Sequence, residues 1–201
     1  MTFLNNRRPG SGASKSLRIA ALAIAAMAFF APGTASAQMH GGGMGHHGAK
    51  GAGHDEVNMP GLRGLDATPE ESGELAAMFR NFEKIERTVE NLPNGIRTHT
   101  FSRDPEIRAV VVSHVVGMLA RVEEGRDPKV FIQSPTLDIL FERRERIATE
   151  IESTDEGIMV TQTSDDPEVV EALQTHAGEV SDMAERGMEA VHEMMMNRMH
   201  N

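Results

Sequence analysis

An internal repeat constrains the fold of this 201-residue chain more than any other feature. When the chain is shifted along itself until Asp104 lies on Asp166, two blocks match without a gap. The matches include Asp104-Pro105-Glu106 with Asp166-Pro167-Glu168, and His114 with His176. Matches at caps, turns and periodic apolar positions are those that repeated structure preserves. We therefore expect two copies of one unit, at about residues 69–126 and 132–188, because a solenoid would need at least about three.

Each unit has the pattern of a helix, a β-hairpin and a second helix. Thr68-Pro69-Glu70-Glu71 is a capping box with Pro at the first helical position, which predicts a helix from Pro69. Alternation from Ile85 to Val89 predicts a strand, and Asn94-Gly95 predicts the tight turn that follows it. Asp104 and Asp166 are the expected N-caps of the long helices. Four strands with helices on one face would form a single α+β domain at residues 68–188, with pseudo-two-fold symmetry.

The N-terminus has every part of a secretory signal peptide. Basic residues precede an apolar run from Ile19 to Ala31, and Ala35-Ser36-Ala37 offers a small-residue cleavage site. The apolar run is too short to span a bilayer comfortably. We expect residues 1–37 to be removed by cleavage after Ala37, leaving a periplasmic protein that is not integral to a membrane.

Composition excludes several classes of protein. The chain has no Cys, Trp or Tyr, and its formal net charge is −10. Without Cys there is no disulfide framework or thiolate metal site, and an acidic chain poor in aromatic residues does not favour nucleic-acid binding. Motifs of nucleotide-binding loops, zinc proteases and serine hydrolases are missing from the sequence. We therefore expect a protein that is not an enzyme.

Both tails of the processed chain concentrate histidine and methionine. Residues 38–67 form a Gly-rich segment expected to be a flexible arm, and residues 189–201 form the end of the last helix. Thioether sulfur is a soft ligand that suits Cu(I), and imidazole also accepts Cu(II), Zn(II) and Ni(II). The candidate metal ligands are His40, Met44, His46, His47, His54, Met188, His192, Met195, Met196, Met199 and His200. A Met-rich helix face is also typical of an adaptable docking surface.

Three further histidines lie inside the predicted domain. His114 and His176 occupy equivalent positions on the apolar stripes of their helices. Pseudo-symmetry could bring them together as axial ligands of a b-type haem or as ligands of a metal ion. The alternative is that each is a core histidine bonded to a neighbour. His99 lies on a predicted strand and is expected to face solvent.

The segments from Asn94-Gly95-Ile96 to Asp104-Pro105-Glu106, and from Gly157 to His176, resemble a family of small exported bacterial proteins. Members carry the same hairpin, Asp-Pro cap and helix histidine, in a unit that is usually duplicated. The resemblance covers most of residues 75–190 and implies the domain organisation and the exported location. It implies no chemistry, and the His/Met-rich tails lie outside it.

These observations lead to one hypothesis with two alternatives. The first is a periplasmic, non-enzymatic metal-binding protein that uses its tails in copper buffering, resistance or delivery, with another periplasmic or membrane-bound protein as a candidate partner. The second is a b-type haem protein that uses His114 and His176. The third is a metal-free interaction module whose Met-rich helix docks on another exported protein.

Overall fold

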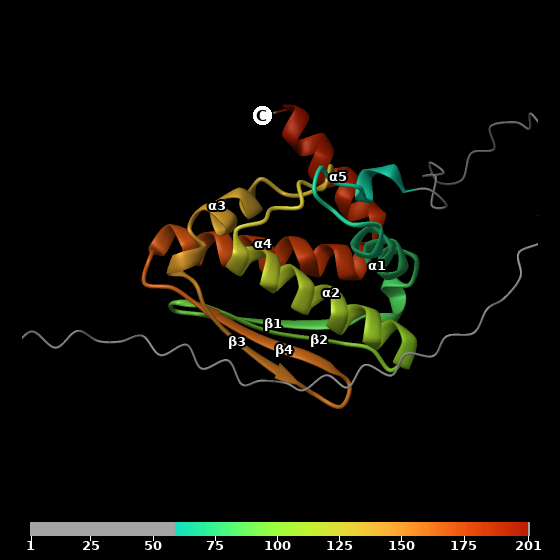
Figure 1. Cartoon of the computed structure of the whole chain (residues 1–201), viewed down its shortest axis with the longest axis horizontal. Coiled ribbons are helices and arrows are strands. Elements are labelled where there is room, and N and C mark those ends of the chain that lie inside the picture. The colour runs from blue at the N-terminus through green and yellow to red at the C-terminus, as the bar shows by residue number, and fades with distance from the viewer. Residues whose placement is uncertain (1–58, 201) are drawn as a thin grey trace, which may run out of the picture. The chain divides into compact units, whose positions relative to one another are not determined.

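The computed structural model describes residues 59–200 of the chain. The expected signal peptide, and the arm residues His40, Met44, His46, His47 and His54, lie outside the described residues. Within the described part, helices and strands are combined in one α+β arrangement of five α-helices and a four-stranded antiparallel sheet (Figure 1). The α+β class predicted from the sequence is therefore confirmed.

The first half of the domain follows its local sequence signals. The capping box at Thr68 is formed: its side chain accepts from the Glu71 backbone N–H, and the Glu71 carboxylate accepts from the Thr68 N–H. Asp104 accepts hydrogen bonds from the N–H groups of Glu106 and Ile107, which caps the second helix. The elements are η1 (Pro60–Leu62), α1 (Pro69–Arg80), η2 (Phe82–Lys84), β1 (Glu86–Leu92), β2 (Gly95–Phe101) and α2 (Pro105–Glu124).

The second half repeats this order of elements. Asp166 accepts from the N–H of Glu168 at the start of its long helix, as Asp104 does at the start of α2. The elements are α3 (Thr136–Glu142), η3 (Arg144–Arg146), β3 (Ala148–Ser153), β4 (Gly157–Thr163), α4 (Pro167–Arg186) and α5 (Met188–His200). The bounds of β2 and β4, and those of α2 and α4, are related by the same offset as the sequence repeat. The duplication itself stays a prediction.

The two hairpins join through their second strands, in the order β1-β2-β4-β3. In the central pair, Gly95 lies opposite Thr163, and Phe101 lies opposite Gly157. A Cβ on Gly95 or Gly157 would meet backbone atoms of the neighbouring strand at 2.0 and 2.2 Å, so both positions require glycine. The helices lie on one face of the sheet, as Figure 1 shows.

Each long helix packs on the hairpin of the other half. Helix α4 contacts β1 and β2, and Ile96 of β2 belongs to the cluster formed by Val169, Leu173 and Ala177 of α4. Helix α2 instead contacts β4, whose Ile158 and Val160 pack with Ile107 and Val111 of α2. The hydrophobic core therefore consists of two clusters, and each of them needs residues from both halves of the domain.

Two boundaries differ from those expected. The flexible arm was expected to extend to residue 67, but Met59 is 8% exposed and Leu62 is 1% exposed, so these two side chains of the segment are buried in the domain. A bridge between Gly64 and Val130 fixes this segment to the α2–α3 connection. The last helix was also expected to run through Gly187. It ends at Arg186, because Gly187 adopts φ 59° and turns the chain into the separate helix α5.

Candidate functional site

Helix α5 carries the His/Met cluster that the sequence predicts. Its inner face is buried at Ala190 and Val191, which are 5% and 1% exposed. Arg198 donates a hydrogen bond to the Gln133 carbonyl oxygen over 2.7 Å, which fastens the end of the helix to the α2–α3 connection. These contacts hold α5 in a defined orientation, so its outer face is a fixed surface of the domain.

The outer face of α5 presents soft metal donors. Met195, Met196 and Met199 are 42%, 38% and 71% exposed, so these three side chains are accessible from solvent. His192 lies three and four residues before Met195 and Met196, so the spacing places these side chains next to one another. We call His192, Met195, Met196 and Met199 the α5 donor face.

The two flanking ligand candidates differ in environment. Met188 is half-buried at the start of α5, one turn before His192. His200 is exposed, and its Nδ1 lies 2.7 Å from the carbonyl oxygen of Met196, which leaves Nε2 for a ligand. Met194 accepts a contact from Arg198 over 3.5 Å on the side of the helix nearer the domain. The donors on this part of α5 are therefore thioethers and imidazoles, with the exposed carboxylates of Glu189 and Glu193 beside them.

Between residues 59 and 200, no three His, Asp or Glu side chains converge where they could hold a metal ion. A site for a hard or borderline metal built from such groups is thus not formed within the described residues. Thioether sulfur is outside that set, and soft ions such as Cu(I) accept it readily.

His114 lies between α1 and α2. Its side chain is 15% exposed, and its Nδ1 lies 3.7 Å from the Glu74 carboxylate, so the two form an ion pair when the imidazole is protonated. Glu74 also accepts a hydrogen bond from the Ser113 hydroxyl over 2.5 Å. The neighbouring His114 imidazole lowers the pKa of Glu74, against the opposing effect of burial.

His176 has a different acidic partner. Its Nδ1 lies 3.4 Å from the carboxylate of Glu179, on the same helix α4. Glu179 also accepts hydrogen bonds from the hydroxyls of Ser134 and Thr136, which anchors the start of α3. Burial raises the pKa of Glu179, but the hydrogen bonds from His176 and Ser134 outweigh it and leave the pKa lowered. No hydrogen bond or ion pair in the described part of the chain joins His114 to His176.

Sequence reasoning missed a buried ionic cluster around Arg121. This residue is 3% exposed, and its guanidinium donates hydrogen bonds to both carboxylate oxygens of Glu71 and to Asp66. The cluster ties the segment before α1 to the end of α2. Hydrogen bonding to Arg121 lowers the pKa of Glu71 to about 2, despite the opposing effect of burial. The sequence signal that could have indicated this cluster is Arg121 on the apolar stripe of helix α2, together with Glu71 in the capping box of α1.

Sequence reasoning also missed the surroundings of His99. This residue was expected to face solvent, but it is only half-exposed and stacks on Phe101 with 4.7 Å between the ring centroids. Its Nε2 lies 3.1 Å from the hydroxyl of Thr154, and the residue opposite it on β4 is Met159. The strand register, which the sequence does not contain, creates this pair.

Comparison with models of known protein families, with curated proteins and with solved structures finds no match. Among the described residues, no helix combines the length and the apolar character needed to cross a membrane.

Proposed function

We propose that this chain is a periplasmic, non-enzymatic metal-binding protein that acts in copper buffering, resistance or delivery. The observation that carries the proposal is the α5 donor face, where three exposed thioethers lie beside an imidazole on a fixed helix. Exposure of three large apolar side chains gives up hydrophobic stabilisation that burial would provide. Binding of a soft ion is a function that would explain why these side chains are exposed.

The donor set supports copper over other metals. Thioether sulfur binds Cu(I) and is a poor ligand for Mg(II), Ca(II) and Mn(II), which prefer oxygen. A cuprous ion needs only a few such donors, and the spacing of His192, Met195, Met196 and Met199 supplies them from neighbouring turns. The N-terminal residues His40, Met44, His46, His47 and His54 lie outside the described residues and would add capture capacity. Export by a cleaved signal peptide is part of the proposal.

The proposal is tested by a competitive titration of the processed chain with Cu(I) and a chromophoric chelator. The variant replaces Met195, Met196 and Met199 with Leu, which removes sulfur but keeps the apolar surface. We expect affinity to fall by about tenfold or more, which corresponds to about 1.4 kcal/mol. Met183→Leu on α4 is the matched control and should bind as the wild type does. Unchanged Cu(I) affinity and stoichiometry in the triple variant would contradict the role of α5.

A second candidate function is the metal-free interaction module. A shallow, open hollow of about 360 Å³ lies beside α5 and is lined in part by Leu65, Phe131, Gln133 and Arg198. Leu65 and Phe131 are 82% and 62% exposed, so apolar surface continues beyond the helix. This function predicts that the wild-type chain binds no Cu(I) in the titration above, whereas any Cu(I) bound through sulfur favours the copper protein.

A further inference from the structure

Within residues 59–200, no helix covers one face of the sheet (Figure 1), and the outward side chains of that face form rows across the four strands. Buried residues such as Ile96, Ile158 and Val160 point toward the helices, so the alternate positions of the same strands point outward. The strand register places Thr88, His99, Met159 and Glu152 in one such row. From this geometry we propose that His99 and Met159 form a second binding site for a soft metal ion, Cu(I), on the outer face of the sheet.

The pairing of His99 with Met159 brings an imidazole and a thioether within reach of one ion. The two residues are direct partners in the antiparallel register of β2 and β4, the central strands of the sheet. Directly opposite residues have Cβ atoms about 4.5–5.5 Å apart and project from the same face. Two soft donors on rigid central strands form a better-defined pair than donors on a loop.

The imidazole of His99 is held in place by its neighbours. It stacks on Phe101 with an angle of 21° between the rings, and its Nε2 lies 3.1 Å from the Thr154 hydroxyl. A hydrogen bond at one ring nitrogen fixes the orientation and tautomer of an imidazole that binds metal through the other. Nδ1 of His99 is therefore the nitrogen assigned to the ion.

The charge around the pair favours a cation. Glu152 lies opposite Met159 on β3 and offers an oxygen as a third donor. The outward positions of the strands carry four glutamates and one arginine, namely Glu86, Glu90, Glu150, Glu152 and Arg97. Arg97 is paired with Glu90 at 3.2 Å, and Arg103 lies 3.8 Å from Glu86, so Glu150 and Glu152 on β3 are the carboxylates that keep the outer face acidic beside Met159. The negative potential of these carboxylates would favour a bound monovalent cation.

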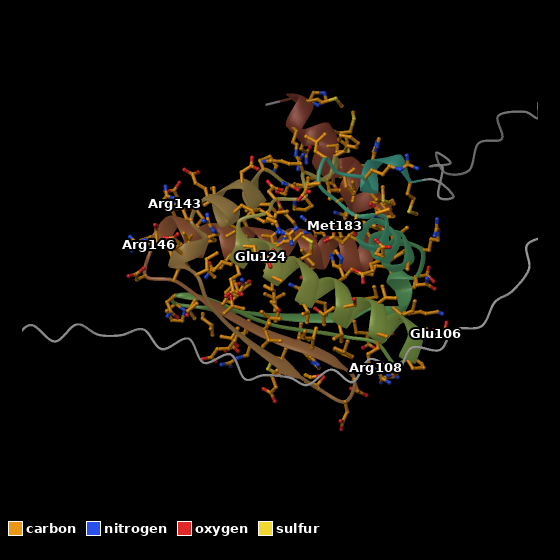
Figure 2. The ribbon with its side chains drawn as sticks, viewed as in Figure 1. Glu106, Arg108, Glu124, Arg143, Arg146 and Met183 are labelled. Carbon is orange, nitrogen blue, oxygen red and sulfur yellow. The ribbon has the colours of Figure 1, made fainter. Side chains whose placement is uncertain are left out.

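The sheet site deepens the proposed function, on which it rests for the identity of the metal, but it is separate from α5. Figure 1 shows α5 above the helix layer, with the sheet on the opposite side of that layer. Met183 of α4, labelled in Figure 2, lies in the helix layer between them. Each site can therefore be removed without altering the donors of the other.

The test uses NMR of the processed chain with ¹³C-labelled methionine methyl groups, titrated with Ag(I) as a probe for Cu(I) that does not change oxidation state. Substitution of Met159 by Leu assigns its methyl signal. We expect this signal to shift during the titration, and His99→Phe, which keeps an aromatic ring on Phe101, to weaken that shift by about tenfold or more. Met183→Leu, the matched control, should leave the Met159 response unchanged.

The outcomes separate the two sites. A Met159 shift that persists in the triple Leu variant of α5 and is lost in His99→Phe supports the sheet site. A Met159 signal that stays in place while the α5 methionines shift overturns the sheet site and leaves the proposed function standing. If the Met159 methyl signal shifts and the signals of Met195, Met196 and Met199 do not, the α5 donor face is rejected and the sheet site stands. A Met159 signal unaffected by His99→Phe also overturns the pairing.

Discussion

The side-chain amide of Gln174 donates a hydrogen bond to the backbone carbonyl oxygen of Leu92 over 3.0 Å. Gln174 belongs to α4 in the second half of the domain, and Leu92 ends β1 in the first. The reciprocal contact runs from Arg108 at the start of α2, whose guanidinium donates to the Asp155 carbonyl oxygen over 2.9 Å. Figure 2 shows Arg108 near this end of the sheet. The two halves therefore hold each other's hairpin turns.

This exchange predicts that neither half folds alone. A fragment that ends at residue 130 lacks Ile158 and Val160, on which α2 packs. A fragment that begins at residue 131 lacks Ile96, on which α4 packs. We expect each fragment to show little native helix by circular dichroism and to gain it when the two are mixed. A fragment that unfolds cooperatively by itself would contradict this interdependence.

The buried Arg121 predicts a large effect of removing its partner. Glu71→Gln leaves a guanidinium that is 3% exposed and, among residues 59–200, keeps Asp66 alone as a carboxylate partner. We expect a loss of about 3 kcal/mol in the free energy of unfolding, measured in urea at pH 7. In the alignment that places Asp104 on Asp166, Glu71 and Arg121 correspond to Gln133 and Met183. The double variant Glu71→Gln with Arg121→Met should therefore be more stable than Glu71→Gln alone. Equal or lower stability of the double variant would contradict this explanation.

The same pair predicts how stability depends on pH. Because the folded-state pKa of Glu71 is lowered from 4.5 to about 2, its contribution is complete above pH 4.5 and is lost as the pH falls toward 2. The wild-type chain should therefore lose stability over this interval. Glu71→Gln should show a shallower loss over the same interval in urea unfolding, since Gln does not titrate there. Parallel pH profiles would show that Glu71 does not carry the effect.

Local signals in the sequence predicted the helix and hairpin boundaries because their causes are local. The Thr68 capping box and the Asp-Pro caps each act within about one turn of backbone, and each is formed. The chain also turns between Leu92 and Gly95, but the turn residues are Pro93 and Asn94, and neither Asn94 nor Gly95 has the positive φ expected of an Asn-Gly turn. The methionine spacing on α5 was also readable, because helical periodicity alone places side chains on one face. These features account for the α+β class and for the α5 donor face.

Features that depend on tertiary packing could not be predicted from the sequence. The crossing of α2 and α4 onto opposite hairpins depends on how the hairpins join, and the pairing of His99 with Met159 depends on the register of β2 with β4. The sequence predicts that the whole apolar stripe of α2 is in the core. In the structure, Ile107 and Val111 are the apolar residues of this helix that are buried. Hydrophobic periodicity shows which face is inside without showing how deeply it is covered.

Gly187 sets the direction of α5 and predicts a selective effect of adding a side chain. Its φ of 59° disfavours other residues, and a Cβ would approach Cδ1 of Phe82 to 2.8 Å. Gly187→Ala should cost about 1–3 kcal/mol of stability and speed hydrogen exchange of the α5 amides. Gly178→Ala is the control, because a Cβ there meets open space within α4 and should stabilise the chain by about 1 kcal/mol. Slower α5 exchange in Gly187→Ala would contradict the role assigned to this turn.

The acidic partners of His114 and His176 provide a test of the duplication. In the alignment that places His114 on His176, Glu74 corresponds to Thr136, and Gly117 corresponds to Glu179. The carboxylate beside His114 is thus Glu74 of α1, whereas the carboxylate beside His176 is Glu179 of α4, the same helix as the histidine. Glu74→Thr should cost about 1–2 kcal/mol, because His114 and the Ser113 hydroxyl lose their carboxylate.

Adding Gly117→Glu to Glu74→Thr recreates the arrangement of the second half. A Cβ at Gly117 meets no atom within 4 Å, so the new side chain fits, and the loss of a helical glycine contributes about 1 kcal/mol. We expect the double variant to recover most of the stability lost in Glu74→Thr, as measured by urea unfolding at pH 7. Gly117→Ala in the Glu74→Thr background separates helix propensity from the new carboxylate. If Ala restores as much stability as Glu, the acid has not been transferred, and the two halves do not use equivalent positions.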